Sequence, residues 1–179
     1  VRNLIEMVGG NLWLVAIYYI YKYRHVNKPG WLYIAGIFTG LAWMIRFQIA
    51  FAVVPIPFIL WYQYRSPRPA IHYSLAVGFM LLMSGLADWH LMGYFAASTI
   101  NNLGLNVGMD ALYNTIPLMY PLELLLFFLP PLSVVGLVMA FRPSFWKGEM
   151  VLAVSTFVFV VAHMLHPNQQ ERFMLSTVP

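Results

Sequence analysis

The sequence contains no cysteine, and only 9% of its 179 residues are charged. Without cysteine the chain has no disulfide framework, no thiolate zinc site and no thiol nucleophile. Soluble domains carry about 25% charged residues, whereas this chain is 61% hydrophobic, so the composition predicts a membrane protein. The formal net charge of +4 comes from only ten Lys and Arg. They cluster in short connecting segments, where they favour a role in membrane topology over nucleic-acid binding.

Six apolar stretches predict membrane helices or half-helices. They are Gly10–Tyr21, Trp31–Ile45, Phe47–Tyr62, Tyr73–Ala87, Tyr120–Phe141 and Met150–Leu165. Several are shorter than the ~20 residues that cross a ~30 Å hydrocarbon core. A single helix over residues 31–62 would measure about 48 Å, too long for one span. We therefore expect two short helices that meet near Arg46, either as two passes or as a re-entrant pair buried in protein.

The charged residues sort between the two sides that these stretches define. One side receives seven of the ten basic residues, namely Lys22, Arg24, Lys28, Arg65, Arg68, Arg142 and Lys147. The positive-inside rule makes that side cytoplasmic. The other side receives Arg2, Arg46 and Arg172 together with five of the six acids, Glu6, Asp88, Asp110, Glu123 and Glu171. The pattern predicts a multi-pass protein whose unusual polar residues gather on the extracytoplasmic face.

The segment Asp88–Met119 on that face is too long for a simple connector. Structureless loops of about thirty residues are uncommon in compact proteins. Apolar residues alternate here with polar ones such as Asn101, Asn102, Asn106 and Asp110. This spacing predicts one or two amphipathic helices lying along the outer membrane surface.

Arg46 and Asp88 are the first candidate site residues. Arg46 lies between two apolar stretches, so it either snorkels or pairs with an acid such as Asp88, or its guanidinium binds an anionic headgroup. Asp88-Trp89-His90 ends the fourth stretch. These residues form either an ordinary interfacial helix end, or a site where Asp88 orients a sugar hydroxyl or a loop and Trp89 offers a flat surface.

The end of the chain holds the densest polar cluster. Asn168, Gln169, Gln170, Glu171 and Arg172 follow an apolar helix that ends near His163 and His166. Five consecutive hydrogen-bonding side chains beside a membrane helix are costly in lipid and suit a water-filled site for a polyol or phosphate. His163 and His166 could share a helix face, but no further metal ligands are evident nearby, so no metal site is predicted. Glu171 and Arg172 could also form a surface ion pair worth little.

This tail resembles the signature of glycosyltransferase family 22, membrane mannosyltransferases of the C-type fold. The family pattern is approximately H-S-x-x-P-H-K-E-x-R-F, with a proline six residues after the phenylalanine; His163, Pro167, Arg172, Phe173 and Pro179 match it. The middle of the chain also resembles the family's middle segment. The matching residues occur in the same order and are Asp88-Trp89, Tyr94-Phe95, Asn101-Asn102, Asn106, Tyr113-Asn114 and the run from Pro117 to Tyr120. The His-Lys-Glu of the pattern is replaced by Asn168-Gln169-Gln170, which suggests a divergent, bacterial branch.

The resemblance implies that residues 1–179 are an internal piece of one membrane-embedded glycosyltransferase domain. Such an enzyme transfers a hexose, here expected to be mannose, from a polyprenyl-phosphate carrier to a lipid-linked or glycan acceptor with inversion. The active face would be extracytoplasmic, at a bacterial inner membrane or in the endoplasmic reticulum lumen. The carboxylate that acts as general base in this fold is expected upstream of Val1, so the fragment alone should be inactive. No cofactor is expected.

The resemblance also assigns roles to the polar tail. Arg172 is the first choice for stabilising the leaving phosphate, Arg46 the second and His163 the third. Glu171 would hold Arg172, while Asn168, Gln169 and Gln170 would contact the sugar or the phosphate. A non-enzymatic transporter or lipid-handling subunit would explain the apolar stretches equally well. A lipid-linked glycan ligase or polymerase of the same fold is a further alternative.

Overall fold

The computed structural model describes residues 2–101, 104 and 150–165, and within these ranges every regular element is a helix. The elements are α1 (Arg2–Val26), α2 (Gly30–Ile45), the 3-10 helix η1 (Phe47–Ile49), α3 (Ala50–Val53), α4 (Pro55–Tyr64), α5 (Pro67–Met92) and α10 (Met150–Leu165). The predicted all-α class is confirmed for this part of the chain.

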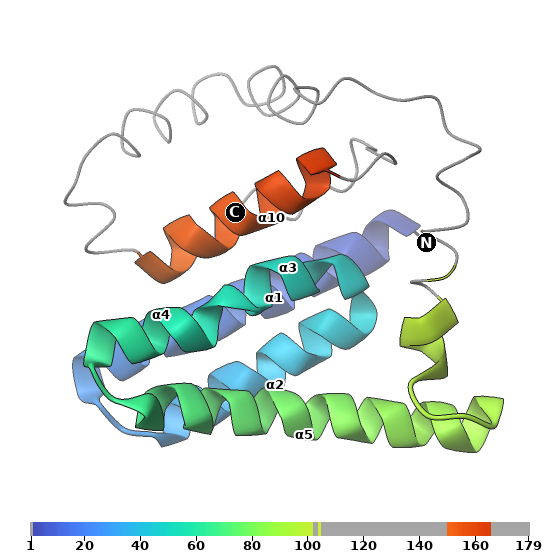
Figure 1. Ribbon diagram of the computed structural model, residues 1–179, viewed down its shortest axis with the longest axis horizontal. Coiled ribbons are helices and arrows are strands. Elements are labelled where there is room, and N and C mark those ends of the chain that lie inside the picture. The colour runs from blue at the N-terminus through green and yellow to red at the C-terminus, as the bar shows by residue number, and fades with distance from the viewer. Residues whose placement is uncertain (1, 102–103, 105–149, 166–179) are drawn as a thin grey trace.

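From α1 to α5 the chain runs back and forth along the long axis of the molecule, and α10 runs in the same direction as α5 (Figure 1). α2 packs between α1 and α5, α4 also packs on α5, and α10 lies against α3 and α4. The connections 27–29 and 65–66 therefore lie at one end of the bundle, while Arg46 and the end of α5 lie at the other. Chain direction alone thus separates the loop residues into two groups, one at each end.

Small residues on α2 allow α5 to approach closely. A Cβ atom added to Gly36 would lie 2.5 Å from the Ala76 Cβ, and one added to Gly40 would lie 2.4 Å from the Met80 Cβ. These two glycines form a G-x-x-x-G pattern, the arrangement that brings helix backbones together in membranes. Between them, the buried Tyr73 hydroxyl donates a hydrogen bond of 3.0 Å to the buried Thr39 Oγ1.

Aromatic rings join α1 to α2 on the other side. Tyr19 stacks on Trp31 and on Phe38, with ring centroids 5.5 and 5.9 Å apart. The Lys22 ammonium lies 4.0 Å from the Trp31 ring centroid, a distance at which the ring face attracts a cation. These contacts place a cation and a cluster of aromatic rings at the end of the bundle where α1 leads into α2.

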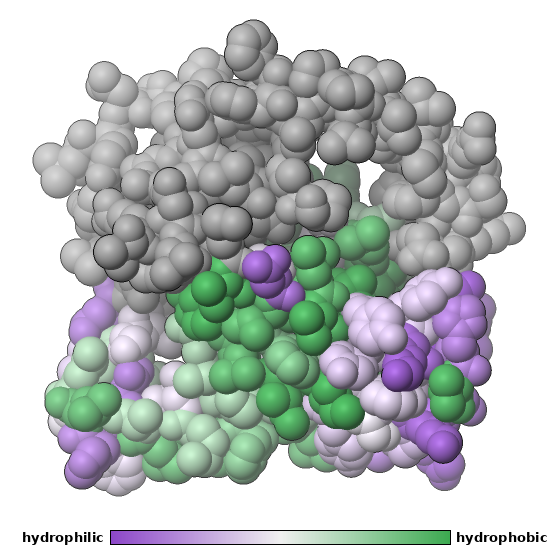
Figure 2. All heavy atoms as spheres, turned by 180° about the vertical axis from the view of Figure 1, so that it is seen from behind, coloured by the Kyte–Doolittle hydropathy of each residue, from purple (hydrophilic) through white to green (hydrophobic). Residues whose placement is uncertain are grey.

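Large apolar side chains also cover the outside of the bundle. The residues Phe58, Trp61, Leu75, Phe79 and Trp89 are each more than half exposed. Figure 2 shows apolar residues across the middle of the face seen from behind, with hydrophilic residues toward the two ends. Two segments, Phe47–Tyr64 with 18 residues and Pro67–Met92 with 26, are long and apolar enough to cross a membrane. An apolar exterior on an all-helical chain is what a bilayer requires, and the protein is an all-α membrane protein.

The break predicted inside Trp31–Tyr62 is confirmed, because α2 ends at Ile45 and η1 begins at Phe47. The stretches Gly10–Tyr21 and Tyr73–Ala87 are the central parts of longer helices, α1 and α5. The stretch Tyr120–Phe141 and most of the predicted amphipathic segment Asp88–Met119 lie outside the described residues.

Candidate functional site

Three predicted site residues belong to one end of the bundle. Arg46 follows α2, Asp88 lies in the last turns of α5, and His163 lies near the end of α10. These helix ends point the same way in Figure 1. For His163 the structure describes the backbone. The shared end is the one that the charge pattern predicts to be extracytoplasmic.

Arg46 lies in the break between α2 and η1, and its backbone forms hydrogen bonds with both helices. Its backbone is extended, with φ −143° and ψ 101°. Its N–H donates to the Ala42 carbonyl at 2.9 Å, and its own carbonyl accepts from the Ile49 N–H at 3.1 Å. The residue therefore satisfies the end of α2 and the start of η1 at once. Such a break lets a polar side chain leave the helix surface without losing backbone hydrogen bonds.

The Arg46 side chain is buried, with only 5% of the residue exposed. It lies against α1, since a Cβ added to Gly9 would be 3.5 Å from the Arg46 Cβ. A permanently charged guanidinium is expensive to place among apolar helices. Ionisable groups that a membrane protein keeps in such a position generally serve an ion or substrate site. The geometry is thus compatible with the anion-binding interpretation of Arg46.

Asp88 fixes the chain that follows α5. Its Oδ2 accepts from the Ser98 backbone N–H at 2.9 Å, and its Oδ1 accepts from the Ser98 hydroxyl at 2.7 Å. Hydrogen bonds to a charged group are worth about 1.5–3 kcal/mol each. The structure therefore shows Ser98, not Arg46, as the hydrogen-bond partner of Asp88. Of the two groups that Asp88 could orient, a sugar hydroxyl or a loop, these hydrogen bonds to Ser98 correspond to the loop.

The chain between Asp88 and Ser98 turns back on α5. Gly93 ends the helix in the left-handed conformation with φ +85°, and its N–H donates to the Trp89 carbonyl at 3.0 Å. The Phe95 ring then lies on Gly85, where an added Cβ would come within 2.3 Å of the ring. Residues 97–101 are helical. The start of the predicted outer segment is thereby held at a defined angle to α5.

Two further residues of this segment have contrasting environments. The Tyr94 hydroxyl donates to the Asn101 Oδ1 at 2.6 Å, so the first asparagine of the Asn-rich stretch is engaged within the segment. Trp89 is 58% exposed, which leaves its indole open to lipid or to a ligand. Substrate binding by Asp88 and Trp89 stays a prediction.

The strongest predicted cluster lies beyond the described part of the chain. Asn168, Gln169, Gln170, Glu171 and Arg172 all follow Leu165, the last described residue. Their proposed roles therefore stay predictions. Within the described residues, no group of three or more His, Cys, Asp or Glu side chains is placed to hold a metal ion.

Sequence reasoning missed the Ser98 partner of Asp88. The available signal was local: serine is favoured near the start of a helix, and Ser98 is the second residue of the helical segment 97–101. The ten-residue separation of Asp88 and Ser98 does not predict their contact. The turn between them depends on Gly93 and on the packing of Phe95.

A comparison with known protein families matches the first part of the chain. The family described as dolichyl-phosphate-mannose-protein mannosyltransferase matches residues 2–89, just under half of the chain. No curated protein and no solved structure matches. The matched range covers α1 to α5 up to Trp89 and so includes Arg46 and Asp88. The match supports assigning the chain to the C-type glycosyltransferases. The tail resembles the same superfamily, and the matched range does not include the tail.

Proposed function

We propose that the protein, as a C-type glycosyltransferase, moves a hexose from a polyprenyl-phosphate carrier to an acceptor hydroxyl on the extracytoplasmic side of a membrane. Mannose is the proposed sugar, and a lipid-linked or glycan acceptor is the proposed partner. The family match over residues 2–89 carries the proposal. The burial of Arg46 at a helix break inside the matched range supports it.

The proposed reaction is a single inverting displacement at the anomeric carbon. An acceptor oxygen attacks C1, the bond from C1 to the phosphate oxygen breaks, and the polyprenyl phosphate leaves with that electron pair. A carboxylate base takes the acceptor proton. Because the leaving group is already a phosphate, it requires stabilisation of negative charge more than a proton.

Arginine suits this task because its guanidinium binds phosphate oxygens through a fixed fork of donors. Arg172 is proposed as the principal phosphate contact and Arg46 as a second one, approached from the break after α2. His163 would add a third donor from the end of α10. Glu171 would orient Arg172, and the amides Asn168, Gln169 and Gln170 would bind the sugar or the phosphate.

The test uses membranes containing the full-length protein and a radiolabelled polyprenyl-phosphate mannose. Arg172→Ala should abolish transfer while leaving expression unchanged. Arg46→Lys keeps the charge and loses the fork, and it should lower transfer about tenfold or more, since charge-assisted hydrogen bonds are worth about 1.5–3 kcal/mol. Arg68→Lys is the matched control, because Arg68 is exposed at the opposite end of the bundle.

Wild-type turnover in Arg172→Ala would remove that residue from the mechanism. Equal activity of Arg46→Lys and Arg68→Lys would return Arg46 to a purely structural role. Absence of transfer from every polyprenyl-phosphate sugar, with substrate uptake by intact vesicles instead, would favour the transporter alternative. Extension of a lipid-linked glycan from another glycan donor would identify the ligase or polymerase.

The description of the matched family favours a second candidate acceptor. That description names protein as the acceptor of mannose. A protein serine or threonine hydroxyl would undergo the same displacement, so the two candidates differ only in what enters the acceptor side. Offering a Ser/Thr-containing peptide and a lipid-linked glycan to the same membranes separates them. Label appearing in the peptide alone would replace the lipid-linked or glycan acceptor with a protein one.

A further inference from the structure

α5 extends further than α2 at the end of the bundle that holds Arg46 (Figure 1). Gly36 of α2 lies against Ala76 of α5. One turn further along both helices, Gly40 lies against Met80, so α2 and α5 run in the same direction. α2 ends five residues after Gly40, whereas α5 ends twelve residues after Met80. The seven additional residues carry the end of α5 about 10 Å beyond the end of α2.

The length of α5 leaves two positions for this end. Its 26 residues measure about 39 Å, which exceeds the ~30 Å hydrocarbon core of a typical bilayer. The end of α5 therefore either projects into water or stays at the interface between lipid and water. The side chains that it exposes decide between the two positions.

The end of α5 and the turn that follows it expose large apolar side chains. We call the following residues the α5-end surface, because each is more than 40% exposed: Leu86, Trp89, Leu91, Met92, Tyr94, Phe95 and Ile100. Leu91 is 77% exposed, more than any other large apolar residue that the structure describes. Apolar exposure on this scale marks a surface that contacts a membrane or another protein.

The same segment has almost no charge. Asp88 is its only charged residue between positions 86 and 101, and this carboxylate is 8% exposed and accepts two hydrogen bonds from Ser98. His90 and Asn101 are exposed polar residues of the segment. A water-facing segment of this length would be expected to carry several charged residues. The composition therefore favours the boundary of a membrane over bulk water.

The α5-end surface also continues the apolar face in the middle of α5. Exposed residues spaced three or four apart form that face, namely Leu75, Phe79, Leu82 and Leu86. Trp89 follows Leu86 by three residues and so extends the same face toward the helix end. Tryptophan and tyrosine gather where hydrocarbon meets water, and Trp89 and Tyr94 both belong to the α5-end surface. Continuity with the lipid-facing side of α5 favours lipid as the partner.

The backbone holds the turn across the end of α5. Ala96 has a left-handed conformation with φ 55°, which is unfavourable for a residue with a Cβ atom and persists where surrounding contacts fix it. Those contacts are the hydrogen bonds between Asp88 and Ser98 and the complete burial of Ala97. Figure 1 shows the helical segment 97–101 crosswise to α5. The exposed side chains of the turn are thereby kept at the level of the α5 end.

We propose that the α5-end surface is embedded in the adjacent membrane leaflet, at the level where acyl chains meet headgroups. Leu91 and Ile100 contact acyl chains, the rings of Trp89 and Tyr94 lie at the boundary, and segment 97–101 runs along the membrane plane. The partner is the lipid surface itself, held by apolar contact and not by charge. The proposal goes beyond the sugar transfer and does not depend on it.

The test measures the membrane depth of spin labels on the full-length protein in phosphatidylcholine vesicles. Leu91→Cys and Ile100→Cys each carry one nitroxide. Residues 1–179 contain no cysteine, and any cysteine elsewhere in the protein is first replaced by serine. Collisions of the nitroxide with oxygen, which concentrates in lipid, are compared with collisions with a water-soluble nickel chelate. The ratio of oxygen to nickel collisions should be several-fold higher at both residues than at a residue in water.

Two matched labels calibrate the depth. Arg68→Cys is the water reference, because Arg68 is exposed at the opposite end of the bundle. Leu75→Cys is the lipid reference, because Leu75 is 59% exposed on the apolar face of α5. The collision ratios of Leu91→Cys and Ile100→Cys should lie between these two values. Thermal unfolding of each labelled protein shows that the fold is intact.

Two results would overturn the proposal. Collision ratios at Leu91→Cys and Ile100→Cys equal to that of Arg68→Cys would place the α5-end surface in water. Low collision rates with both oxygen and the nickel chelate at both residues would show that protein covers the surface, either another segment or a second copy. Because the measurement does not involve sugar transfer, the membrane contact and the proposed enzyme activity can fail separately.

Discussion

Gly36→Ala tests the close packing of α2 against α5. The added Cβ would lie 2.5 Å from the Ala76 Cβ, 2.7 Å from the Tyr73 carbonyl oxygen and 3.2 Å from the Val77 nitrogen. Two of these neighbours are backbone atoms, so rotation of a side chain cannot relieve the contact. Carbon atoms prefer separations of about 3.5–4.0 Å, and α5 would have to move away from α2 by about 1 Å.

The energetic cost follows from that displacement. Overpacking of this kind costs about 1–3 kcal/mol. The 3.0 Å hydrogen bond from Tyr73 to Thr39 lies one turn away and would be stretched beyond its useful range. Alanine recovers up to about 1 kcal/mol of helix propensity over glycine. We therefore expect a net loss of about 1–3 kcal/mol, which corresponds to a melting temperature lower by roughly 2–12 °C for a chain of this size.

The measurement is thermal unfolding of the purified full-length protein, followed by the fluorescence of its tryptophans, of which six lie in this chain. Gly78→Ala is the matched control, because a Cβ added to this α5 glycine meets nothing within 4 Å. It should leave the melting temperature unchanged or raise it slightly. A melting temperature that rises equally in Gly36→Ala and Gly78→Ala would refute the close contact between α2 and α5.

Two further substitutions probe individual hydrogen bonds. Tyr73→Phe removes the hydrogen bond donor of the buried Thr39 hydroxyl, which should cost about 1–2 kcal/mol of stability and lower the melting temperature by a few degrees. Tyr33→Phe removes a hydroxyl at an exposed residue and should change the melting temperature little. Equal effects of the two substitutions would contradict the reasoning. Asp88→Asn removes the charge that holds Ser98, so hydrogen exchange at the Ser98 amide, followed by mass spectrometry, should accelerate about tenfold or more. Unchanged exchange at that amide would show that the loop is held by other contacts.

The break after α2 could be predicted because its cause is local. One helix over residues 31–62 would be too long for a membrane, and a single arginine interrupts the apolar run. The length of α5 was underestimated for an equally local reason. The predicted stretch Tyr73–Ala87 omits Pro67 and Pro69, yet both lie in the first turn of α5, where proline is tolerated. Ser66 caps that turn by accepting from the Arg68 N–H at 3.4 Å.

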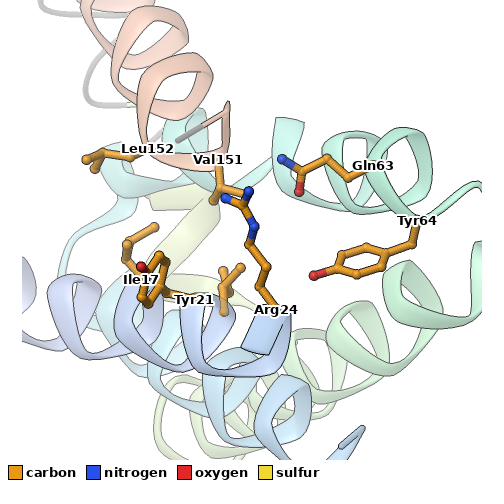
Figure 3. A pocket seen from close by; sticks show the side chains of 8 residues that line it. Ile17, Tyr21, Arg24, Gln63, Tyr64, Val151 and Leu152 are labelled. Carbon is orange, nitrogen blue, oxygen red and sulfur yellow. The ribbon is translucent and has the colours of Figure 1, made fainter. Parts of the chain in front are cut away.

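Contacts between distant segments could not be predicted from one sequence. The Asp88–Ser98 clamp requires a left-handed Gly93 and a ring of Phe95 packed on Gly85, and neither produces a periodic pattern. The cleft that Arg24, Tyr64 and Val151 help to line joins α1, α4 and α10, which are far apart in the chain (Figure 3). Of the candidate site, the location of Arg46 and Asp88 at one end of the bundle followed from charge sorting, while the polar tail stays a prediction.

The length of α2 has a consequence for the surrounding lipid. Its 16 residues measure about 24 Å along the axis, roughly 6 Å less than the hydrocarbon thickness of a typical bilayer. Such a shortfall is met by local thinning of the lipid leaflet or by long side chains that reach outward. The helix break after Ile45 would then lie closer to the lipid headgroups than the end of a full-length span does. Under the proposed function, the phosphate of a carrier lipid could approach Arg46 there without leaving the membrane plane.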